Sequence, residues 1–242
     1  MDVEGCPVPE DLLYDLEHDI WFRWDEDRRA GRIGVLSSLA AFAGKVTSVG
    51  FREVVGTVAR GRSVGLIEST RYTGAVRMPV DGSVLERNVE LVQRPKLVND
   101  STYDRGWFVR IAPVNLEGVE RSLETAVQIR ERLAQRIREQ HVHCLPAWPD
   151  VEMFEIGAEC AAILAELDQV LGTRQANDIV LLMTDDPTSP IEMVRWADRT
   201  GHTVLVHERE GNLHRFLVRK ETDPHPRGPY GSEGGGRRAS SD

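Results

Sequence analysis

Residues 56–70, GTVARGRSVGLIEST, and residues 75–88, AVRMPVDGSVLERN, carry the pattern that decides the fold of the first half of the chain. Both have the character of short β-strands broken by glycine, and the stretch RYTG lies between them. The same pattern of short apolar runs interrupted by glycine continues on either side, in RIGVL (32–36), KVTSVGF (45–51) and GWFVRIAP (106–113). Short strands separated by turn residues predict an all-β domain, either a flattened barrel or a sandwich.

A helix is expected after these strands. Apolar residues recur at helical spacing from Leu116 to Ile137, with arginine and glutamate between them, so we predict one amphipathic helix packed against the β domain. The next stretch, HVHCLPAWPD (141–150), has two prolines and no periodicity, which is typical of a linker. We therefore divide the chain into a first domain at 1–140 and a linker at 141–152.

The second half alternates strand and helix. An apolar start at 153–156, a helix from Cys160 to Leu171, a strand IVLLM, a second helix, and strands TVLVHE and RFLVRK give the order β-α-β-α-β-β. This order predicts a small α+β two-layer sandwich over 153–220 with both helices on one face. Ser189, Pro190 and Glu192 predict the start of the second helix through a capping box. Residues 221–242 contain too few apolar side chains to fold, so we expect a disordered tail.

Composition limits the possible partners. The chain of 242 residues has 30 basic and 39 acidic side chains, a net charge of −9 that repels a phosphate backbone, so we expect no nucleic-acid partner. No run approaches the roughly 20 apolar residues of a membrane helix. The start, MDVEGCPVPEDLL, lacks the basic and apolar segments of a secretion signal. We expect a soluble, cytoplasmic protein without a membrane partner.

The cysteines are few. Cys6, Cys144 and Cys160 are an odd number in a chain large enough to fold without disulfides, so we expect reduced thiols. His141, His143 and Cys144 form an H-x-H-C cluster, but a tetrahedral site would lack an evident fourth ligand. We expect no metal site and interpret this cluster as part of a polar linker.

Several motifs of the first half resemble those of the glycine cleavage H protein, in the same order and spacing. They are H-D-I-W (18–21), G-L-I-E-S (65–69), M-P-V-D-G (78–82) and L-V-N-D…Y-x-x-G-W (97–107). The resemblance covers about residues 10–140 and implies a lipoyl-type domain. In that family a hairpin after Glu-Ser presents a lysine that carries lipoate as a swinging arm.

Arg71 stands where the resemblance places that lysine, after Glu68 and Ser69. A guanidinium remains protonated and offers no nucleophilic amine, so we expect no lipoyl group and no other cofactor. Arg71 itself is either a solvated turn residue or a residue for anion binding or docking. The nearest lysines, Lys45 and Lys96, lie outside the hairpin sequence.

Residues 153–220 resemble the TusA (SirA-like) sulfur carriers. The shared marks are G-x-x-C (157–160), a strand ending in D-D-P (185–187), H-E-R-E-G (207–211) and the closing R-F-L-V-R-K. The resemblance implies that Cys160 opens the first helix, accepts sulfane sulfur as a persulfide and passes it on. The chain departs from the family's C-P-x-P pattern, because Ala161 and Ile163 replace both prolines.

Two alternatives remain open for Cys160. A helix N-terminus stabilises a thiolate, so a working sulfur site should have a depressed thiol pKa, whereas the nearby Glu155 and Glu159 oppose ionisation. The other interpretation is a retained, half-buried cysteine at a helix start. Cys6 also lies in a C-P-x-P sequence, which we interpret as a chance match or a tether for the N-terminal arm. Asp185 and Asp186 are interpreted as turn and cap residues.

The favoured function is that of a sulfur-relay carrier, in which Cys160 takes sulfur from a donor such as a cysteine desulfurase and gives it to an acceptor protein. The non-lipoylated H-like domain would serve for docking, with lipoate-linked or glycine cleavage proteins as further partners. The alternative is a non-catalytic adaptor or a degenerate H protein in glycine decarboxylation or a lipoate-dependent pathway. We find no set of nucleophile, base and orienting residue for an independent enzyme, so the activity is at most that of a sulfurtransferase.

Overall fold

A computed structural model describes residues 1–224 of the chain and divides it into two compact units, residues 1–148 and residues 149 onward. The division between Trp148 and Pro149 lies within the stretch expected to be a linker. None of the helices in the described residues combines the length and apolar character needed to cross a membrane. The predicted disordered tail lies outside the described residues, apart from residues 221–224.

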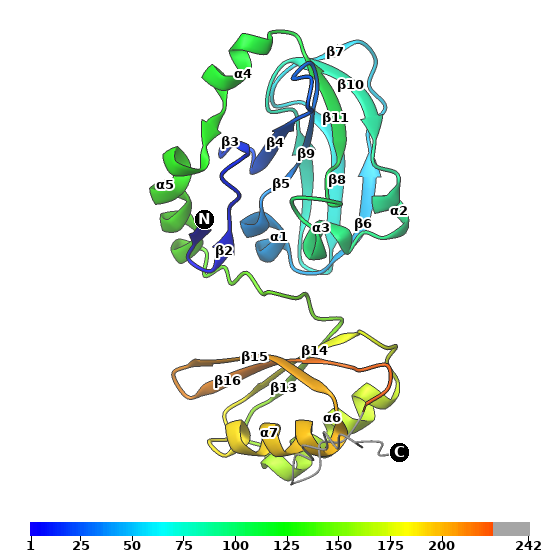
Figure 1. Cartoon of the computed structure of the whole chain (residues 1–242), viewed down its shortest axis with the longest axis vertical. Helices are drawn as coiled ribbons and strands as arrows, with labels where there is room; N and C mark the ends of the chain where they lie inside the picture. Colours follow the sequence, from blue (N-terminus) through cyan, green and yellow to red (C-terminus); the bar gives the residue numbers. More distant parts are fainter. Residues whose placement is uncertain (225–242) are drawn as a thin grey trace, which may run out of the picture. The chain divides into compact units, whose positions relative to one another are not determined.

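The first unit is an antiparallel sandwich (Figure 1). A seven-stranded sheet has the order β12-β3-β4-β5-β11-β10-β7, and its strands are β3 (Leu13–Asp15), β4 (Ile20–Trp24), β5 (Gly31–Val35), β7 (Thr57–Val58), β10 (Gly82–Arg87), β11 (Val109–Pro113) and β12 (Glu124–Thr125). The second sheet has the order β6-β8-β9, with β6 (Val46–Phe51), β8 (Ser63–Ser69) and β9 (Thr73–Arg77). The sheets keep separate edges throughout residues 1–148, so the sandwich form of the predicted fold is confirmed and the barrel does not close.

Alternation along the strands explains why this unit has two layers of core. In β4, the side chains of Ile20 and Phe22 pack between the two sheets, whereas Trp21 points to the opposite face, where it packs under α5 (Ala126–Glu139). Successive side chains of a strand leave opposite faces, so one strand can contribute to both cores. The remaining short elements are β1 (Asp2–Val3), β2 (Cys6–Pro7), α1 (Ser37–Ala43), α2 (Glu90–Gln93) and α3 (Leu97–Asp100).

The prediction of one helix from Leu116 to Ile137 is wrong, because the segment forms two helices, α4 (Leu116–Ser122) and α5. Between them β12 pairs with β3, which takes the backbone out of the helical region. Thr125 then restarts the helix with a capping box: the Gln128 amide donates to Thr125 Oγ1, and the Thr125 amide donates to Gln128 Oε1 over 2.7 Å. In the sequence, the T-x-x-Q pattern of residues 125–128 indicates this helix start.

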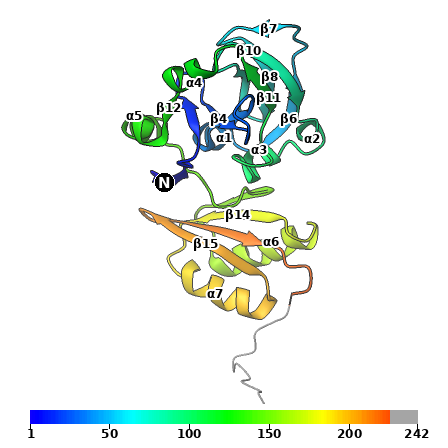
Figure 2. The ribbon, with the colours of Figure 1, turned by 45° about the horizontal axis from the view of Figure 1, so that its top comes forward.

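The second unit has the predicted β-α-β-α-β-β order (Figures 1 and 2). Its elements are β13 (Val151–Glu155), α6 (Cys160–Gly172), β14 (Ile179–Thr184), α7 (Ser189–Thr200), β15 (Thr203–Glu210) and β16 (Leu213–Arg219). The sheet order is β13-β14-β16-β15, and β13 and β14 are parallel. Both helices cover the same face, where Leu167 and Trp196 pack on Val180 and Phe216. The Trp196 indole also donates to Asp168 over 2.8 Å, which joins the helices.

The predicted capping box at Ser189 is wrong. The helical backbone conformation already begins at Thr188, so Ser189 lies inside the first turn, and its hydroxyl is buried without a hydrogen-bond partner in the described residues. The cap comes from Asp186 instead, whose Oδ1 accepts from the Thr188 amide and hydroxyl over 2.7 and 2.6 Å. A residue shifted by one position cannot aim its hydroxyl at the free amides of the first turn.

Candidate functional site

The sequence places Cys160 at the first residue of α6, and the structure confirms that position. The chain leaves β13 at Glu155 and turns at Gly157, whose φ of 74° suits glycine. Ile163 occupies the position of the second family proline: its amide donates to the Glu159 carbonyl over 3.2 Å, and its side chain is buried in the core. The helix therefore starts regularly without either proline. The hydrogen bond and the core packing of Ile163 stabilise its first turn in place of the rigid proline rings.

A pair of aspartates holds the loop that carries Cys160. Asp185 and Asp186 follow β14, and because β13 and β14 are parallel, their carboxyl ends lie at the same edge of the sheet. Asp185 Oδ1 accepts from the Gly157 amide, and Asp186 Oδ2 accepts from the Cys160 amide, both over 2.7 Å. The interpretation of both aspartates as turn and cap residues is confirmed, and Asp186 caps two helices at once.

The thiol of Cys160 is less acidic than the sequence led us to expect. The residue is only 7% exposed, and burial raises the pKa of the thiol, with the charges of Asp186 and Glu192 adding to the effect. A hydrogen bond from the Thr188 side chain acts in the opposite direction but is the smallest contribution. The structure therefore does not show the depressed pKa expected of a working sulfur site, and the direction of the shift agrees with the alternative of a buried cysteine at a helix start. The positive end of the α6 dipole faces a carboxylate, which offsets its effect on the thiol.

The hydrogen bonds of Thr188 hold the pKa of the Asp186 carboxyl below its usual range, and the Cys160 amide and His214 contribute in the same direction. Asp186 is therefore a carboxylate at neutral pH. Its backbone is fixed as well, since its amide donates to Thr184 Oγ1 over 3.1 Å and Thr184 is fully buried. The fold therefore holds the negative charge of Asp186 close to the Cys160 thiol.

Two histidines that sequence reasoning left without a role lie close to this loop. His214 on β16 is buried and lies opposite Thr184 of β14 in the sheet register. Its Nδ1 lies 3.0 Å from Nε2 of His207, and the two rings stack. Burial lowers the pKa of His214, so this imidazole is neutral at pH 7. In the sequence, this pair could have been recognised from the positions of the two histidines on either side of the turn between β15 and β16.

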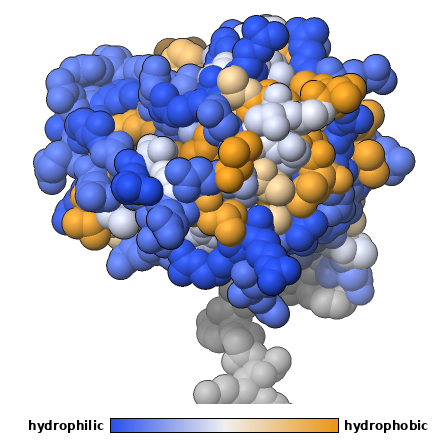
Figure 3. All heavy atoms as spheres, turned by 90° about the horizontal axis from the view of Figure 1, so that it is seen from above, coloured by the Kyte–Doolittle hydropathy of each residue, from blue (hydrophilic) through white to orange (hydrophobic). Residues whose placement is uncertain are grey.

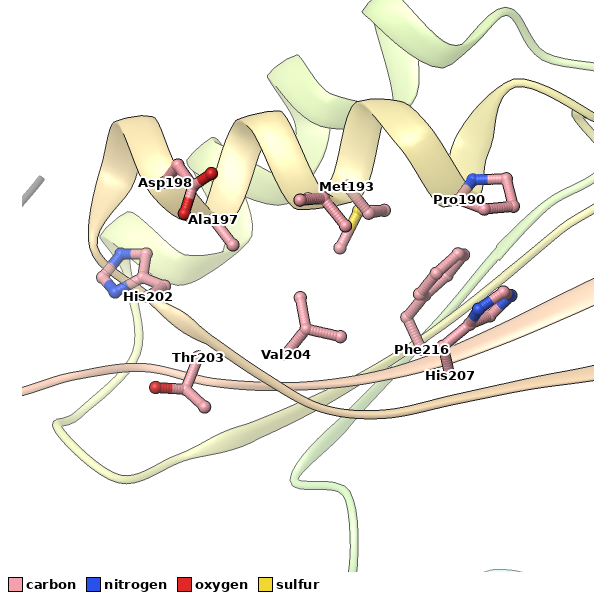
Figure 4. Close-up of a pocket in the computed structure, with 10 residues that line it drawn as sticks. Pro190, Met193, Ala197, Asp198, His202, Thr203, Val204, His207 and Phe216 are labelled. Carbon is pink, nitrogen blue, oxygen red and sulfur yellow. The ribbon is translucent and has the colours of Figure 1, made fainter. Parts of the chain in front are cut away.

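A pocket of about 240 Å³ lies between α7 and the β15–β16 hairpin. Figure 4 shows Met193 and Ala197 of α7 facing Val204 and Phe216 of the sheet, with His202 and His207 at opposite ends. Cys160 does not line this pocket. A ligand bound there would therefore not meet the thiol directly.

In the first unit, Arg71 lies in the turn between β8 and β9, as the family pattern predicts. Its Nε donates to the Ala43 carbonyl over 3.4 Å and its Nη2 to the Ala41 carbonyl over 3.3 Å. Ser69 Oγ also donates to the Ala43 carbonyl and accepts from the amides of Arg71 and Tyr72. The guanidinium thus lies on the C-terminal carbonyls of α1, a stabilising position for a cation. Glu68 is exposed in β8 beside this turn.

Lysine is not far from this turn. Val46, the first residue of β6, pairs with Ser69, so the exposed Lys45 directly precedes this neighbouring strand and lies next to the hairpin. Lys96 is the residue before α3. The sequence had separated both lysines from the hairpin, whereas the strand register brings Lys45 beside it.

The expectation that all three cysteines are reduced is wrong: Cys6 and Cys144 form a disulfide, with an S–S distance of 2.02 Å. Cys6 is fully buried beside Val142 and Trp148, so the tether interpretation of Cys6 is the correct one. The bond connects β2 to the stretch that follows α5. A bonded Cys144 cannot act as a thiolate ligand in the H-x-H-C cluster.

Another group with metal-ligating side chains, Asp15, Glu17 and His18, lies in the first unit. Arg60 Nη2 already donates to both Asp15 oxygens, over 3.0 and 3.1 Å, and to Glu17 over 2.9 Å. His18 Nδ1 is 2.7 Å from Asp15. The guanidinium takes the place of a cation here, and the group is best described as an ion-pair network.

Comparison with known proteins agrees with this two-part architecture. The family model "Glycine cleavage H-protein" matches residues 12–136, and the family model "Sulfurtransferase TusA" matches residues 156–220. The sandwich with its β8–β9 hairpin thus corresponds to a lipoyl-type module, followed by a TusA domain. The chain belongs to the glycine cleavage H-protein family.

Individual relatives match the first unit. Two glycine cleavage system H proteins of Aquifex aeolicus, numbers 2 and 5, are 33% and 35% identical over 59% of this chain and cover 88% and 98% of their own lengths. The Listeria monocytogenes H protein is 35% identical over 49% of this chain and 92% of its own length. The crystal structure of a Mycobacterium marinum H protein matches 52% of this chain and 98% of its own at 26% identity, with a TM-score of 0.46.

Proposed function

We propose that this protein is a sulfur carrier in which Cys160 accepts sulfane sulfur as a persulfide. The Cys160 thiolate attacks the outer sulfur of a donor persulfide, a new S–S bond forms, the donor's S–S bond breaks, and the donor cysteine leaves as a thiolate. The exchange involves no net oxidation, so it needs no cofactor. Transfer to an acceptor thiol is the same reaction in the next step.

The position of Cys160 carries this proposal. It is the one cysteine of the chain outside the disulfide, and it opens α6 within the residues that match the TusA model. Its loop is held at a sheet edge by Asp185 and Asp186. Since the thiol is 7% exposed, a donor must open this loop to reach the sulfur.

For the H-like unit we propose a docking role without lipoate. The guanidinium of Arg71 is held against α1 and offers no acyl-accepting amine. Figure 3 shows apolar side chains gathered among charged ones on the face seen from above, over the β7, β10 and α4 end of the unit. Exposed apolar residues of this unit include Val55, Leu85, Val114 and Leu116. Exposed apolar surface of this kind is suited to a protein partner.

The proposed donor is a cysteine desulfurase, and the proposed acceptor is a thiol-bearing protein. Lipoate-linked or glycine cleavage proteins are the proposed partners of the H-like unit. We place the relay in the cytoplasm, because a free carrier thiol needs a reducing compartment. A disulfide is unusual in that compartment, so the redox state of the Cys6–Cys144 pair in freshly lysed cells tests the placement.

The deciding experiment is intact mass after incubation of the full chain with a cysteine desulfurase and cysteine. A gain of one sulfur atom, mapped to the peptide with Cys160 and removed by a thiol reductant, is the expected result. Cys160→Ser should show no gain, and Cys160→Ala checks that the serine itself is not disruptive. Sulfur found equally in the Cys160→Ser protein would refute the carrier role.

A second function is favoured by the electrostatics of the same site. If the carboxylate of Asp186 keeps the thiol unreactive toward every donor, the chain is a non-catalytic adaptor or a degenerate H protein. The sulfur-loading experiment separates the two: an adaptor would retain partner binding in the Cys160→Ser variant and load no sulfur in the unsubstituted protein.

A further inference from the structure

We propose that Asp186 is a positioning residue that holds Cys160 as an unreactive thiol at rest and must release the Cys160 amide before the sulfur can react. The inference rests on the proposed function only in taking Cys160 as the reacting group. It concerns how reactivity is controlled, which neither the TusA match nor the position of the cysteine addresses.

Geometry supports this role first. Asp186 lies between the starts of α6 and α7, and its two oxygens serve different helices. Oδ2 accepts the Cys160 amide over 2.7 Å, and Oδ1 accepts the amide and hydroxyl of Thr188 over 2.7 and 2.6 Å. The backbone hydrogen bond to Thr184 completes the attachment. The carboxylate is thus directed at the amide of the reactive residue itself.

The charges around the thiol all bear on its ionisation. Asp186 and Glu192 disfavour the thiolate, and the Thr188 hydroxyl favours it. Arg195 lies 2.7 Å from Glu192 and partly neutralises it, whereas Asp186 forms no ion pair with a lysine or arginine in the described residues, and its neighbour His214 is neutral at pH 7. Asp186 is therefore the main charged obstacle to ionisation of Cys160.

The position of this carboxylate also suggests how a donor could activate the site. A donor that opens the loop from Gly157 to Cys160 would break the two aspartate contacts that hold it. The free Cys160 amide and the positive end of α6 would then face the sulfur anion instead of the carboxylate. Reactivity would in this way depend on docking, which limits loss of persulfide to other thiols.

The test removes the charge and keeps the hydrogen-bond acceptor. Asp186→Asn retains an oxygen for the Cys160 amide, and Asp186→Ser, a favourable neutral cap, serves if the asparagine variant does not fold. The matched control is Asp185→Asn, because Asp185 is the adjacent carboxylate and binds Gly157 rather than Cys160.

The readout is the rate of alkylation by iodoacetamide across a pH series in the full chain. With the Cys6–Cys144 disulfide closed, Cys160 is the only thiol, so no background substitution is required. The midpoint of the pH–rate profile should fall in Asp186→Asn and stay unchanged in Asp185→Asn. At pH 7 the rate should rise about threefold for each unit by which the midpoint falls, because thiolate fraction grows tenfold while nucleophilicity decreases.

An unchanged midpoint in Asp186→Asn, or an equal shift in Asp185→Asn, would overturn the inference. Circular dichroism of each variant verifies that the second unit is folded before rates are compared. Because alkylation requires no sulfur donor, the outcome is independent of the carrier proposal. A shifted midpoint without desulfurase-dependent loading would leave the role of Asp186 standing and reject the carrier function.

Discussion

Opening the Cys6–Cys144 disulfide should strongly destabilise the first unit. The bond joins residues 138 positions apart, so it closes a loop that contains almost the entire unit. Opening the bond increases the conformational entropy of the unfolded state and thereby stabilises that state relative to the folded one. The loop-entropy relation gives about 5 kcal/mol for a loop of this length, and native disulfides generally contribute about 2–5 kcal/mol. That is comparable with the total stability of many domains, about 5–15 kcal/mol. The unit with both cysteines replaced should therefore be only marginally stable.

The perturbation is the double variant Cys6→Ala/Cys144→Ala, since alanine avoids burying a new hydroxyl at the fully buried Cys6. Urea unfolding followed by tryptophan fluorescence is suitable, because four of the five tryptophans lie in the first unit: Trp21, Trp24, Trp107 and Trp148. Cys160→Ala is the control and should leave that transition in place. An unchanged urea midpoint in the double variant, or three alkylatable thiols in unreduced, denatured protein, would refute the reasoning.

Three further predictions concern modification, domain independence and pH. Protein from a lipoylating host should carry no lipoyl group, and Arg71→Lys should restore acceptance; a lipoyl adduct mapped to Lys45 in the unsubstituted chain would contradict this. Fragments covering 1–148 and 149–242 should each unfold cooperatively in calorimetry, while a fragment ending at residue 140 should be less stable because it lacks Cys144 and Trp148; a fragment that is unfolded alone would argue for a shared core. The second unit should lose stability as pH falls from about 6.5, the unfolded pKa of histidine, because burial lowers the folded pKa of His214 and the unfolded chain binds more protons. Replacing His214 with glutamine should reduce that pH dependence and leave the part that comes from His202, whose pKa burial also lowers; an equally steep urea-midpoint profile would count against the assignment.

Local sequence determined much of this protein. The glycine-punctuated runs of residues 32–113 predicted an all-β domain, either a sandwich or a flattened barrel, because alternation and turn chemistry act over a few residues. The order of the second unit and the place of Cys160 at a helix start followed in the same way. The sequence alone also showed that position 71 offers no amine for lipoate attachment, because this conclusion depends only on the chemistry of the Arg71 guanidinium.

Tertiary structure decided the features that depend on residues far apart in the sequence. Cys6 and Cys144 are 138 positions apart, and only the packing of β2 and α5 in one core brings their sulfurs together. The acidity of Cys160 stayed open in the sequence, because the helix start was visible there, while the carboxylate of Asp186, 26 positions later, reaches its amide only through the parallel pairing of β13 and β14. Burial and through-space charge set a pKa, and neither is a property of neighbouring residues in the chain.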